Sequence, residues 1–379
     1  MKGKIKSIFC HTSLISITAL LFLASFAVAE ETPSTENFTK ENSEEDDFQR
    51  FSAIPALGYT EETELEYGAM LILFFKPDYD GGASSSIDFA AYGTTKKQFE
   101  AYIEPRYYFF HDKINGEMSL TFDKWTSLFY GIGNNPNSND SWTYDQTNLF
   151  LTNTTSTNLG LPKALQNFMY GISFRIDYSD VDFKDYDGDM EQPETYGSLR
   201  TGFGYQISYD SRDNDNWAKH GFYAHWQHLF FTDAIGDCNF TKQELDLRGY
   251  TFLFWKTSMA VGVLWQRTEG DVPFDLLAGP DGSERFRGVE YLYFRDNQAL
   301  IIQTELRKVL FWRLAGTIFF EGGKTGKYFS DLLREKWHRS IGFGGELGLN
   351  LAERLYVRGD FSWIDNEEIG LTISIRQAF

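Results

Sequence analysis

From residue 51 to the end of the chain, hydrophobic and polar residues alternate in consecutive short segments. In the last segment two faces separate, with Ile369, Leu371, Ile373, Ile375 and Phe379 on one and Gly370, Thr372, Ser374 and Arg376 on the other. A period of two is the period of a β-strand whose faces meet different surroundings. The pattern therefore predicts strands with one apolar face.

The segment before it alternates in the same way. Its apolar face is predicted to carry Leu355, Val357, Phe361 and Trp363, and its opposite face Tyr356, Arg358, Asp360 and Ser362. Large aromatic side chains on the apolar face, opposed by charges, are typical of a strand that faces lipid outward and a polar interior inward. A strand of a soluble sandwich shows the same period but usually carries fewer large aromatic residues.

Repeating this reading predicts sixteen strands, at 53–60, 65–77, 84–93, 96–110, 115–126, 143–153, 165–180, 197–209, 219–232, 238–250, 253–267, 297–309, 312–321, 341–351, 353–363 and 367–378. An even number brings both ends to the periplasmic side. The turns after the tenth, twelfth and fourteenth strands are tight, whereas 127–142, 181–196, 268–296 and 322–340 are long, as external loops are. The fold class predicted is all-β, a 16-stranded antiparallel transmembrane barrel. The connection at 154–164 is long for a periplasmic turn.

Composition agrees with a barrel. The chain has 35 Phe, 21 Tyr and 9 Trp, a mean hydropathy of −0.37 and a net charge of −19. No apolar run after residue 29 reaches the roughly 18 residues that a membrane-spanning helix needs, which argues against a helical membrane protein. The acidic charge argues against a nucleic-acid partner. A closed barrel satisfies its backbone internally and needs only alternate apolar residues.

The first residues predict export. Lys2, Lys4 and Lys6 precede an apolar run that closes on Ala27-Val28-Ala29, so 1–29 is predicted to be a signal peptide cleaved after Ala29. Residues 30–50 are acidic and predicted to be a disordered periplasmic lead-in, and 51–379 the barrel. Only Cys238 follows the signal, which excludes an intramolecular disulfide.

The segment 270–307 contains a charged and aromatic stretch, "ERFRGVEYLYFRDN", at 284–297. It resembles the sixth-loop region of the bacterial surface antigen (D15-like) barrels of the BamA/TamA outer-membrane superfamily. The resemblance extends to "YGIG" at 130–133, "YDSRDN" at 209–214, "HGF" at 220–222, "FFEGG" at 319–323, "RGDFSW" at 358–363 and the terminal "RQAF". It covers essentially all of 51–379.

The resemblance implies that the sixth external loop folds into the lumen through an Arg-Gly motif. By position that motif is Phe286-Arg287-Gly288-Val289, although the family usually has a β-branched residue before the arginine and an aromatic one after the glycine. A closer match in letters, at 247–250, lies inside a predicted strand. Strand parity turns Glu321 and Asp360 inward, so we expect Arg287 to pair with Glu321, Asp360 or both. The family usually has aspartate where Glu321 stands. The alternative is that Arg287 is a solvated residue of a surface loop.

The last strand also resembles the signal by which outer-membrane barrels are passed to the barrel assembly machinery. The residues that carry this resemblance are Gly370, Ile373, Ile375 and Phe379. The expected partners are accordingly outer-membrane lipid and lipopolysaccharide, that machinery during biogenesis, and an unidentified polypeptide client.

Other sites fit the sequence poorly. Asp185, Asp187 and Asp189 in the acidic segment 181–196 lack the glycine and glutamate spacing of an EF-hand. An acidic external loop, cross-linked to lipopolysaccharide by divalent ions, is the preferred interpretation. No nucleophile elbow, zinc-protease motif or phosphate loop occurs. We predict no enzyme activity, no cofactor and no metal site.

Two functions remain open. One is a barrel that assists protein insertion into, or translocation across, the outer membrane; the segment 30–50 is too short for a POTRA domain, so clients would arrive through a separate partner. The other is a passive pore or structural surface barrel. A mismatched junction between the first strand, which contains Pro55, and the last would favour the first function. A fully paired junction and an open lumen would favour the second.

Overall fold

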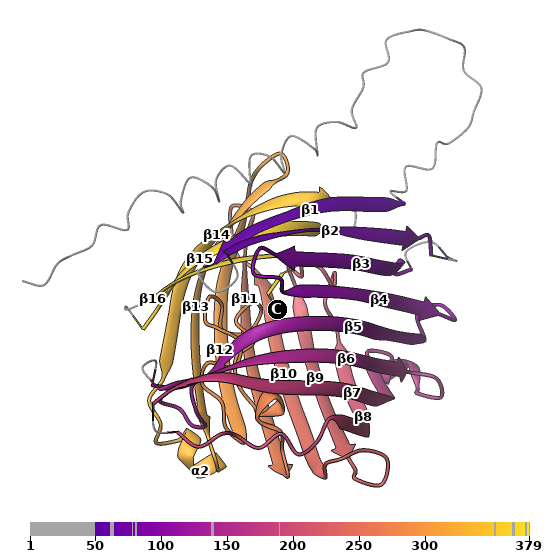
Figure 1. The fold of residues 1–379 in the computed structure, drawn as a ribbon. Coiled ribbons are helices and arrows are strands. Elements are labelled where there is room, and N and C mark those ends of the chain that lie inside the picture. Colours follow the sequence, from indigo (N-terminus) through magenta and orange to yellow (C-terminus); the bar gives the residue numbers. More distant parts are fainter. Residues whose placement is uncertain are drawn as a thin grey trace, which may run out of the picture.

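The computed structural model describes residues 50–379, except 61–63, 78, 80–81, 138–139, 189, 352–353, 366–367, 376 and 379; the side chains of 56–60, 64, 187 and 375 are also outside the description. The predicted signal peptide and nearly all of the predicted lead-in lie outside the described residues. The described part is almost entirely β-structure (Figure 1). No helix among its residues is long and apolar enough to cross a membrane.

The sixteen strands form one antiparallel sheet in chain order. They are β1 (Phe51–Thr60), β2 (Glu64–Phe75), β3 (Ser85–Thr94), β4 (Phe99–Phe109), β5 (Ile114–Phe129), β6 (Ser141–Thr157), β7 (Phe168–Asp187), β8 (Leu199–Asp210), β9 (Gly221–Phe231), β10 (Phe240–Phe252), β11 (Thr257–Gly270), β12 (Gln298–Phe311), β13 (Leu314–Gly326), β14 (His338–Asn350), β15 (Leu355–Ile364) and β16 (Glu368–Ile375). The predicted strand number and order are confirmed.

Several boundaries differ from the prediction. β6 begins at Ser141 and ends at Thr157, beyond both ends of the predicted strand 143–153. β7 begins at Phe168, later than the predicted start at 165, but continues to Asp187, well past the predicted end at 180. The acidic segment 181–196 was predicted to be a loop, but its first part, through Asp187, continues β7 and pairs with β6. This happens because an antiparallel pair can extend beyond the membrane, where alternation with apolar residues is no longer required. The connection after β6 contains the short 3₁₀ helix η1 (Lys163–Leu165) and leaves the strand count unchanged.

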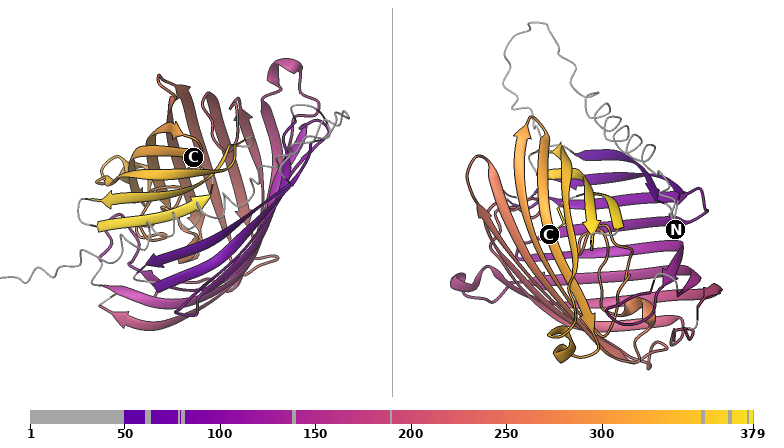
Figure 2. Two further views of the ribbon diagram at one scale, coloured as in Figure 1. Left: turned by 90° about the horizontal axis from the view of Figure 1, so that it is seen from above. Right: turned by 90° about the vertical axis from the view of Figure 1, so that its left-hand side faces the viewer.

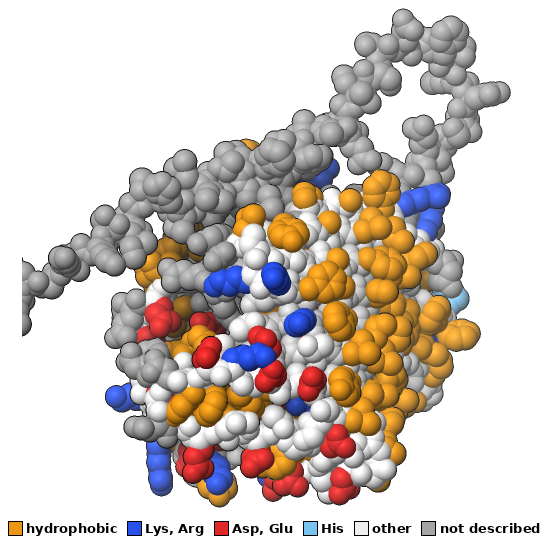
Figure 3. Space-filling model, in the orientation of Figure 1, with side chains coloured by type: hydrophobic (Ala, Val, Ile, Leu, Met, Phe, Trp, Pro, Cys, Tyr) orange, Lys and Arg blue, Asp and Glu red, His pale blue; other side chains and the backbone are white. Residues whose placement is uncertain are grey.

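The outer face of the sheet is apolar. On β13, Ile318 and Phe320 are 63% and 43% exposed, whereas Phe319 between them is 2% exposed. On β16, Ile369, Leu371 and Ile373 are exposed as predicted. Figure 3 shows apolar side chains gathered in a broad band at the right of the view, with charged side chains towards the lower left. Such a band is the surface that a membrane barrel presents to lipid.

The two edges of the sheet meet without pairing. β1 and the last strands lie at the same side of the molecule (Figures 1 and 2), yet no ladder joins β1 to β16 in the described part of the chain. We call this boundary the seam. Leu355 and Val357 were predicted to face lipid, but they are 1% and 7% exposed, and Leu355 packs in one cluster with Ile54, Met70 and Ile72 of β1 and β2. The prediction for these two residues was wrong. The edges overlap at Leu355, so the N-terminal strands cover the start of β15.

Pro55 lies on the free edge of β1. Its partner in the β1–β2 register is Ala69, and the N–H of Phe74 donates to the C=O of Arg50 at 2.8 Å, which makes the even-numbered residues of β1 the hydrogen-bonded ones. Odd-numbered residues therefore direct their backbone groups away from β2. Pro55 removes a donor from the edge that β16 would need, and leaves the β1–β2 ladder intact.

Candidate functional site

The connection between β11 and β12, residues 271–297, folds into the interior of the barrel; we call it loop six. It begins with the 3₁₀ helix η2 (Phe274–Leu276), which is buried. Ala278, Phe286 and Arg287 are 0% exposed, and Phe294 and Arg295 are 1% exposed. This confirms the fold predicted for loop six. A surface loop would not bury charged residues this completely.

Arg287 lies at the centre of the docked loop. Its Nε donates to Glu321 Oε1 at 2.7 Å and its backbone N–H donates to Glu321 Oε2 at 2.6 Å. Nη1 lies 2.6 Å from Glu305 Oε2 and donates to Asp360 Oδ2 at 3.4 Å. The guanidinium also stacks on Phe319, 3.5 Å from the ring centroid. The structure thus brings Arg287 against both carboxylates named from sequence parity, and adds Glu305.

Two more arginines complete the cluster. Arg307 donates through Nε to Glu305, and Arg358 lies 3.0 Å from Asp360. The six side chains of this lumen cluster are at most 1% exposed, and they are Arg287, Arg307, Arg358, Glu305, Glu321 and Asp360. Three guanidinium groups and three carboxylates balance one another, which is the condition for burying charges at acceptable cost.

Electrostatics keep Arg287 charged. Burial alone would lower the pKa of its guanidinium, but the carboxylates of Glu321, Glu305 and Asp360 outweigh burial and raise that pKa above its usual value. Arg287 is therefore a permanent cation, and it cannot leave these carboxylates by losing a proton.

A second arginine of loop six anchors it to another wall. Arg285 Nη2 donates to Asp246 Oδ2 of β10 at 2.5 Å, and its Nη1 donates to Gln303 Oε1 at 2.6 Å. Arg248, in the closer textual match at 247–250, also binds Asp246 at 2.5 Å from within β10. The Arg-Gly pair at 248 is thus part of a strand, as predicted, and contributes to the wall that receives Arg285.

The tip of loop six touches the last strand. Gly288 has a φ of +88°, and a Cβ there would lie 1.9 Å from Ser362 Oγ. A Cβ on Gly370 would lie 2.3 Å from Gly288 Cα. Only glycine fits at both positions, because the two backbones are in direct contact. The structure therefore brings together the loop-six motif and the first residue of the predicted assembly signal, which sequence spacing could not show.

Loop six is also held by contacts to the connection between β5 and β6 and to strands β8 and β14. Gly133, in the "YGIG" stretch, donates its N–H to the C=O of Arg295 at 2.7 Å. Arg200 of β8 forms a bidentate pair with Asp275, with distances of 2.7 and 3.0 Å. Phe294 stacks on His338 of β14 with ring centroids 4.4 Å apart. Loop six is therefore attached to strands on both sides of the lumen.

The turn 211–220, which is on the side predicted to be periplasmic and contains Ser211–Asn214 of the "YDSRDN" motif and His220 of "HGF", also turns inward. Trp217 is 2% exposed and packs edge-to-face on Tyr356, with centroids 4.5 Å apart. Asp213 binds Arg354 of the β14–β15 turn at 2.5 Å. Burial would raise the pKa of Asp213, but the hydrogen bonds from Arg354 and from the N–H groups of His220 and Lys219 lower it.

The remaining sequence-predicted residues are placed as follows. Val289 is 7% exposed inside the lumen, and Ile373 is 47% exposed on the outer face. Ile375 ends β16, while Phe379 lies outside the described residues. In the described part of the chain no three His, Cys, Asp or Glu residues gather as a metal site; Asp189 is not among those residues. Sequence reasoning missed Glu305 and Arg307, although both fall on the inward parity of β12.

Known protein families and solved structures share this arrangement of strands. The model of the Omp85 superfamily domain matches residues 82–366. BamA from Haemophilus ducreyi lacking POTRA domains 1–3 is similar with a TM-score of 0.54 at 11% identity, over 98% of this chain and 78% of that one. CdiB from Acinetobacter baumannii has a TM-score of 0.51 at 10% identity, over 86% of this chain and 59% of that one. At such identities the likeness shows the fold. No curated protein sequence matches the chain.

Proposed function

This chain belongs to the Omp85 superfamily, and from that premise we propose that it assists the insertion of polypeptides into the outer membrane or their translocation across it. The observation that carries the proposal is the seam, where β1 and β16 have no ladder between them in the described part of the chain. The polypeptide client is the partner that this function requires.

An unpaired strand edge can template another strand. The odd-numbered residues of β1 direct their N–H and C=O groups away from β2, and such groups pair with any extended segment that reaches them. In lipid, unpaired backbone groups are costly. A client strand that pairs at the seam would satisfy them and enter the membrane already hydrogen-bonded. Pro55 weakens closure of the seam by removing one donor at that edge.

The filled lumen supports the same function. A passive pore needs an open lumen and a closed wall, whereas here loop six occupies the interior and the wall is open at one place. Loop six, held by Arg287, would prevent leakage while the seam receives a client. The predicted assembly signal at Gly370, Ile373, Ile375 and Phe379 remains a prediction for the biogenesis of the protein itself.

The proposal is tested by the folding of a small outer-membrane barrel, diluted from urea into liposomes with and without this protein. Folding is followed by the faster migration of folded barrels in unheated gels. The wild type should accelerate folding relative to protein-free liposomes. Pro55→Val supplies a backbone N–H at the free edge of β1 and so allows one more hydrogen bond across the seam, worth about 0.5–1.5 kcal/mol. By favouring closure of the seam it should slow client folding roughly two- to tenfold.

Pro105→Val is the matched control, because Pro105 lies in β4 between paired neighbours and away from the seam. It should leave the rate of client folding unchanged. If wild-type protein accelerates folding no more than empty liposomes do, the proposed function is wrong. If Pro55→Val and Pro105→Val behave alike, the seam is not the route.

A further inference from the structure

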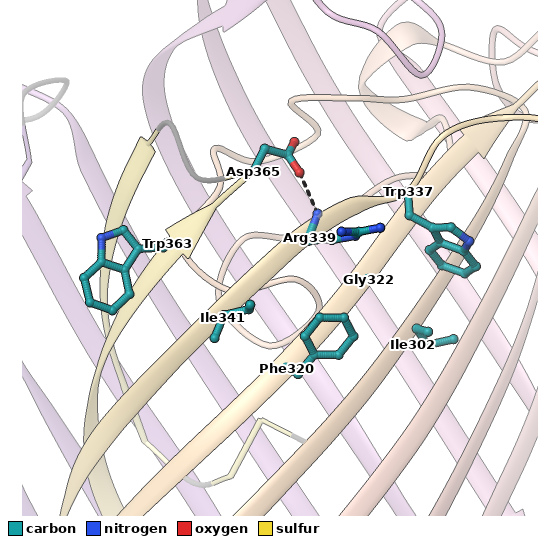
Figure 4. A pocket seen from close by; sticks show the side chains of 8 residues that line it. All are labelled: Ile302, Phe320, Gly322, Trp337, Arg339, Ile341, Trp363 and Asp365. Carbon is teal, nitrogen blue, oxygen red and sulfur yellow. Dashed lines mark hydrogen bonds between the residues drawn. The ribbon is translucent and has the colours of Figure 1, made fainter.

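The outer wall of the barrel contains a groove between β12 and β15. It has a volume of about 310 Å³ and is lined by Ile302, Phe320, Gly322, Trp337, Arg339, Ile341, Trp363 and Asp365 (Figure 4). Phe320, Ile341 and Trp363 belong to the apolar outer face and are 43–47% exposed. The groove therefore opens towards the lipid and not towards the lumen.

Gly322 forms the floor of the groove. A Cβ at this position would lie 3.2 Å from Trp337 Cε3 and 3.3 Å from Ile302 Cγ1, so the space between these two side chains exists because residue 322 has none. Lys324 helps to hold Trp337, since its Nζ lies 4.3 Å from the ring centroid. The groove is thus built into the wall of the barrel, and the ring of Trp337 forms one of its sides.

The external end of the groove is cationic. Arg339 is the second residue of β14, and Figure 4 shows its guanidinium across the top of the groove, pointing towards Trp337. Among the described residues no carboxylate lies within ion-pair distance of that guanidinium. Asp365 is close, but its Oδ1 accepts the backbone N–H of Arg339 at 2.8 Å and its Oδ2 lies 2.6 Å from His338 Nδ1. Its two oxygens are engaged and turned away from the guanidinium.

We propose that this groove binds a phosphate-bearing lipid of the outer leaflet, with one acyl chain along Phe320 and Ile341 and the phosphate at Arg339. The guanidinium presents paired donors that match phosphate oxygens. Its position at the external strand ends, where β13 leads into β14, is the depth of lipid headgroups. The volume of the groove is at the lower end of the range for ligand pockets, so it accommodates one acyl chain and not a whole lipid.

A polypeptide fits this groove less well. β13 and β14 are paired on both edges, so their backbone groups are used within the sheet. A client strand could add no ladder hydrogen bonds here, unlike at the seam. The groove offers apolar side chains and one cation, and an anionic amphiphile uses both.

The test is native mass spectrometry of the full chain released from detergent micelles, titrated with bisphosphorylated lipid A and with lipid A whose phosphates have been removed. Wild type should retain one bisphosphorylated molecule. Arg339→Gln should weaken its binding about fivefold, the contribution of one basic residue near an anionic membrane surface. Dephosphorylated lipid A should bind both proteins equally, at the weaker level. Inorganic phosphate should not compete, since it lacks the chain.

Two further variants separate headgroup from chain. Arg334→Gln removes an exposed arginine that lies in the connection leading into β14 and does not line the groove, and this variant should bind as wild type does. Gly322→Val fills the floor of the groove and should weaken the binding of both forms of lipid A. Its folding is checked by migration in unheated gels. If it does not fold, the test is the comparison of Arg339→Gln with Arg334→Gln for binding of bisphosphorylated lipid A. Equal affinity of those two variants for bisphosphorylated lipid A, or equal affinity of wild type for both forms, would overturn the proposal.

Discussion

Replacing Arg287 by alanine tests whether the lumen cluster holds loop six in place. The substitution removes the contacts to Glu321, Glu305 and Asp360 and leaves three buried carboxylates facing two guanidinium groups. Leaving one buried charge without its partner costs about 3–5 kcal/mol. That corresponds to a shift of roughly 150- to 5,000-fold in the equilibrium between docked and released loop six.

Single-channel recording in planar bilayers measures this equilibrium directly. Wild-type protein should show small, fluctuating conductance because loop six fills the lumen, and Arg287→Ala should show large or unstable openings. Adding Glu321→Gln to Arg287→Ala restores equal numbers of charges and should recover part of the closed state. Arg267→Ala is the control, because Arg267 and Glu269 form an exposed pair with 40% and 67% of their side chains accessible. Such pairs contribute about 1 kcal/mol or less.

The reasoning is refuted if the wild type conducts as a large, steady pore that Arg287→Ala does not change. It is also refuted if Arg287→Ala and Arg267→Ala give the same traces, since loop six would then be held by other contacts.

Two further predictions concern contacts at the ends of the barrel. Gly370→Ala places a Cβ 2.3 Å from the backbone of loop six. It should therefore destabilise the docking of loop six by about 1–3 kcal/mol and increase the conductance. Gly345→Ala is the control and should leave the conductance unchanged, because its Cβ would meet nothing within 4 Å. The pKa of Asp213 is lowered in the folded protein. Its ion pair with Arg354 therefore stabilises the turn 211–220 at pH values above ~3.9, the ordinary pKa of aspartate. This stabilisation is lost as the pH falls through the lowered pKa. Arg354→Ala should release the turn at neutral pH and abolish that acid transition. The transition is followed by the fluorescence of Trp217, obtained as the difference in emission between each protein and the same protein carrying Trp217→Phe. A transition that Arg354→Ala leaves unchanged would show that other groups titrate.

The parity of single strands predicted much of the lumen cluster. Glu321 and Asp360 could be assigned inward because side chains alternate strictly along a strand. Glu305 and Arg307 lie on the same parity of β12, but nothing in the local pattern said that Arg287 would reach that strand. The reach depends on how deeply loop six enters and how the wall curves, and both are set by contacts between residues far apart in the chain.

Alternation in the sequence determined the number and order of the strands, because lipid requires an apolar outer face on every strand that crosses it. It also determined which residues of most strands face outward. The tertiary structure alone decided that the sheet edges overlap and bury Leu355, that Gly288 meets Gly370, and that a groove forms beside Gly322. These features depend on the curvature of the whole sheet and on the space between neighbouring side chains, and local periodicity contains neither.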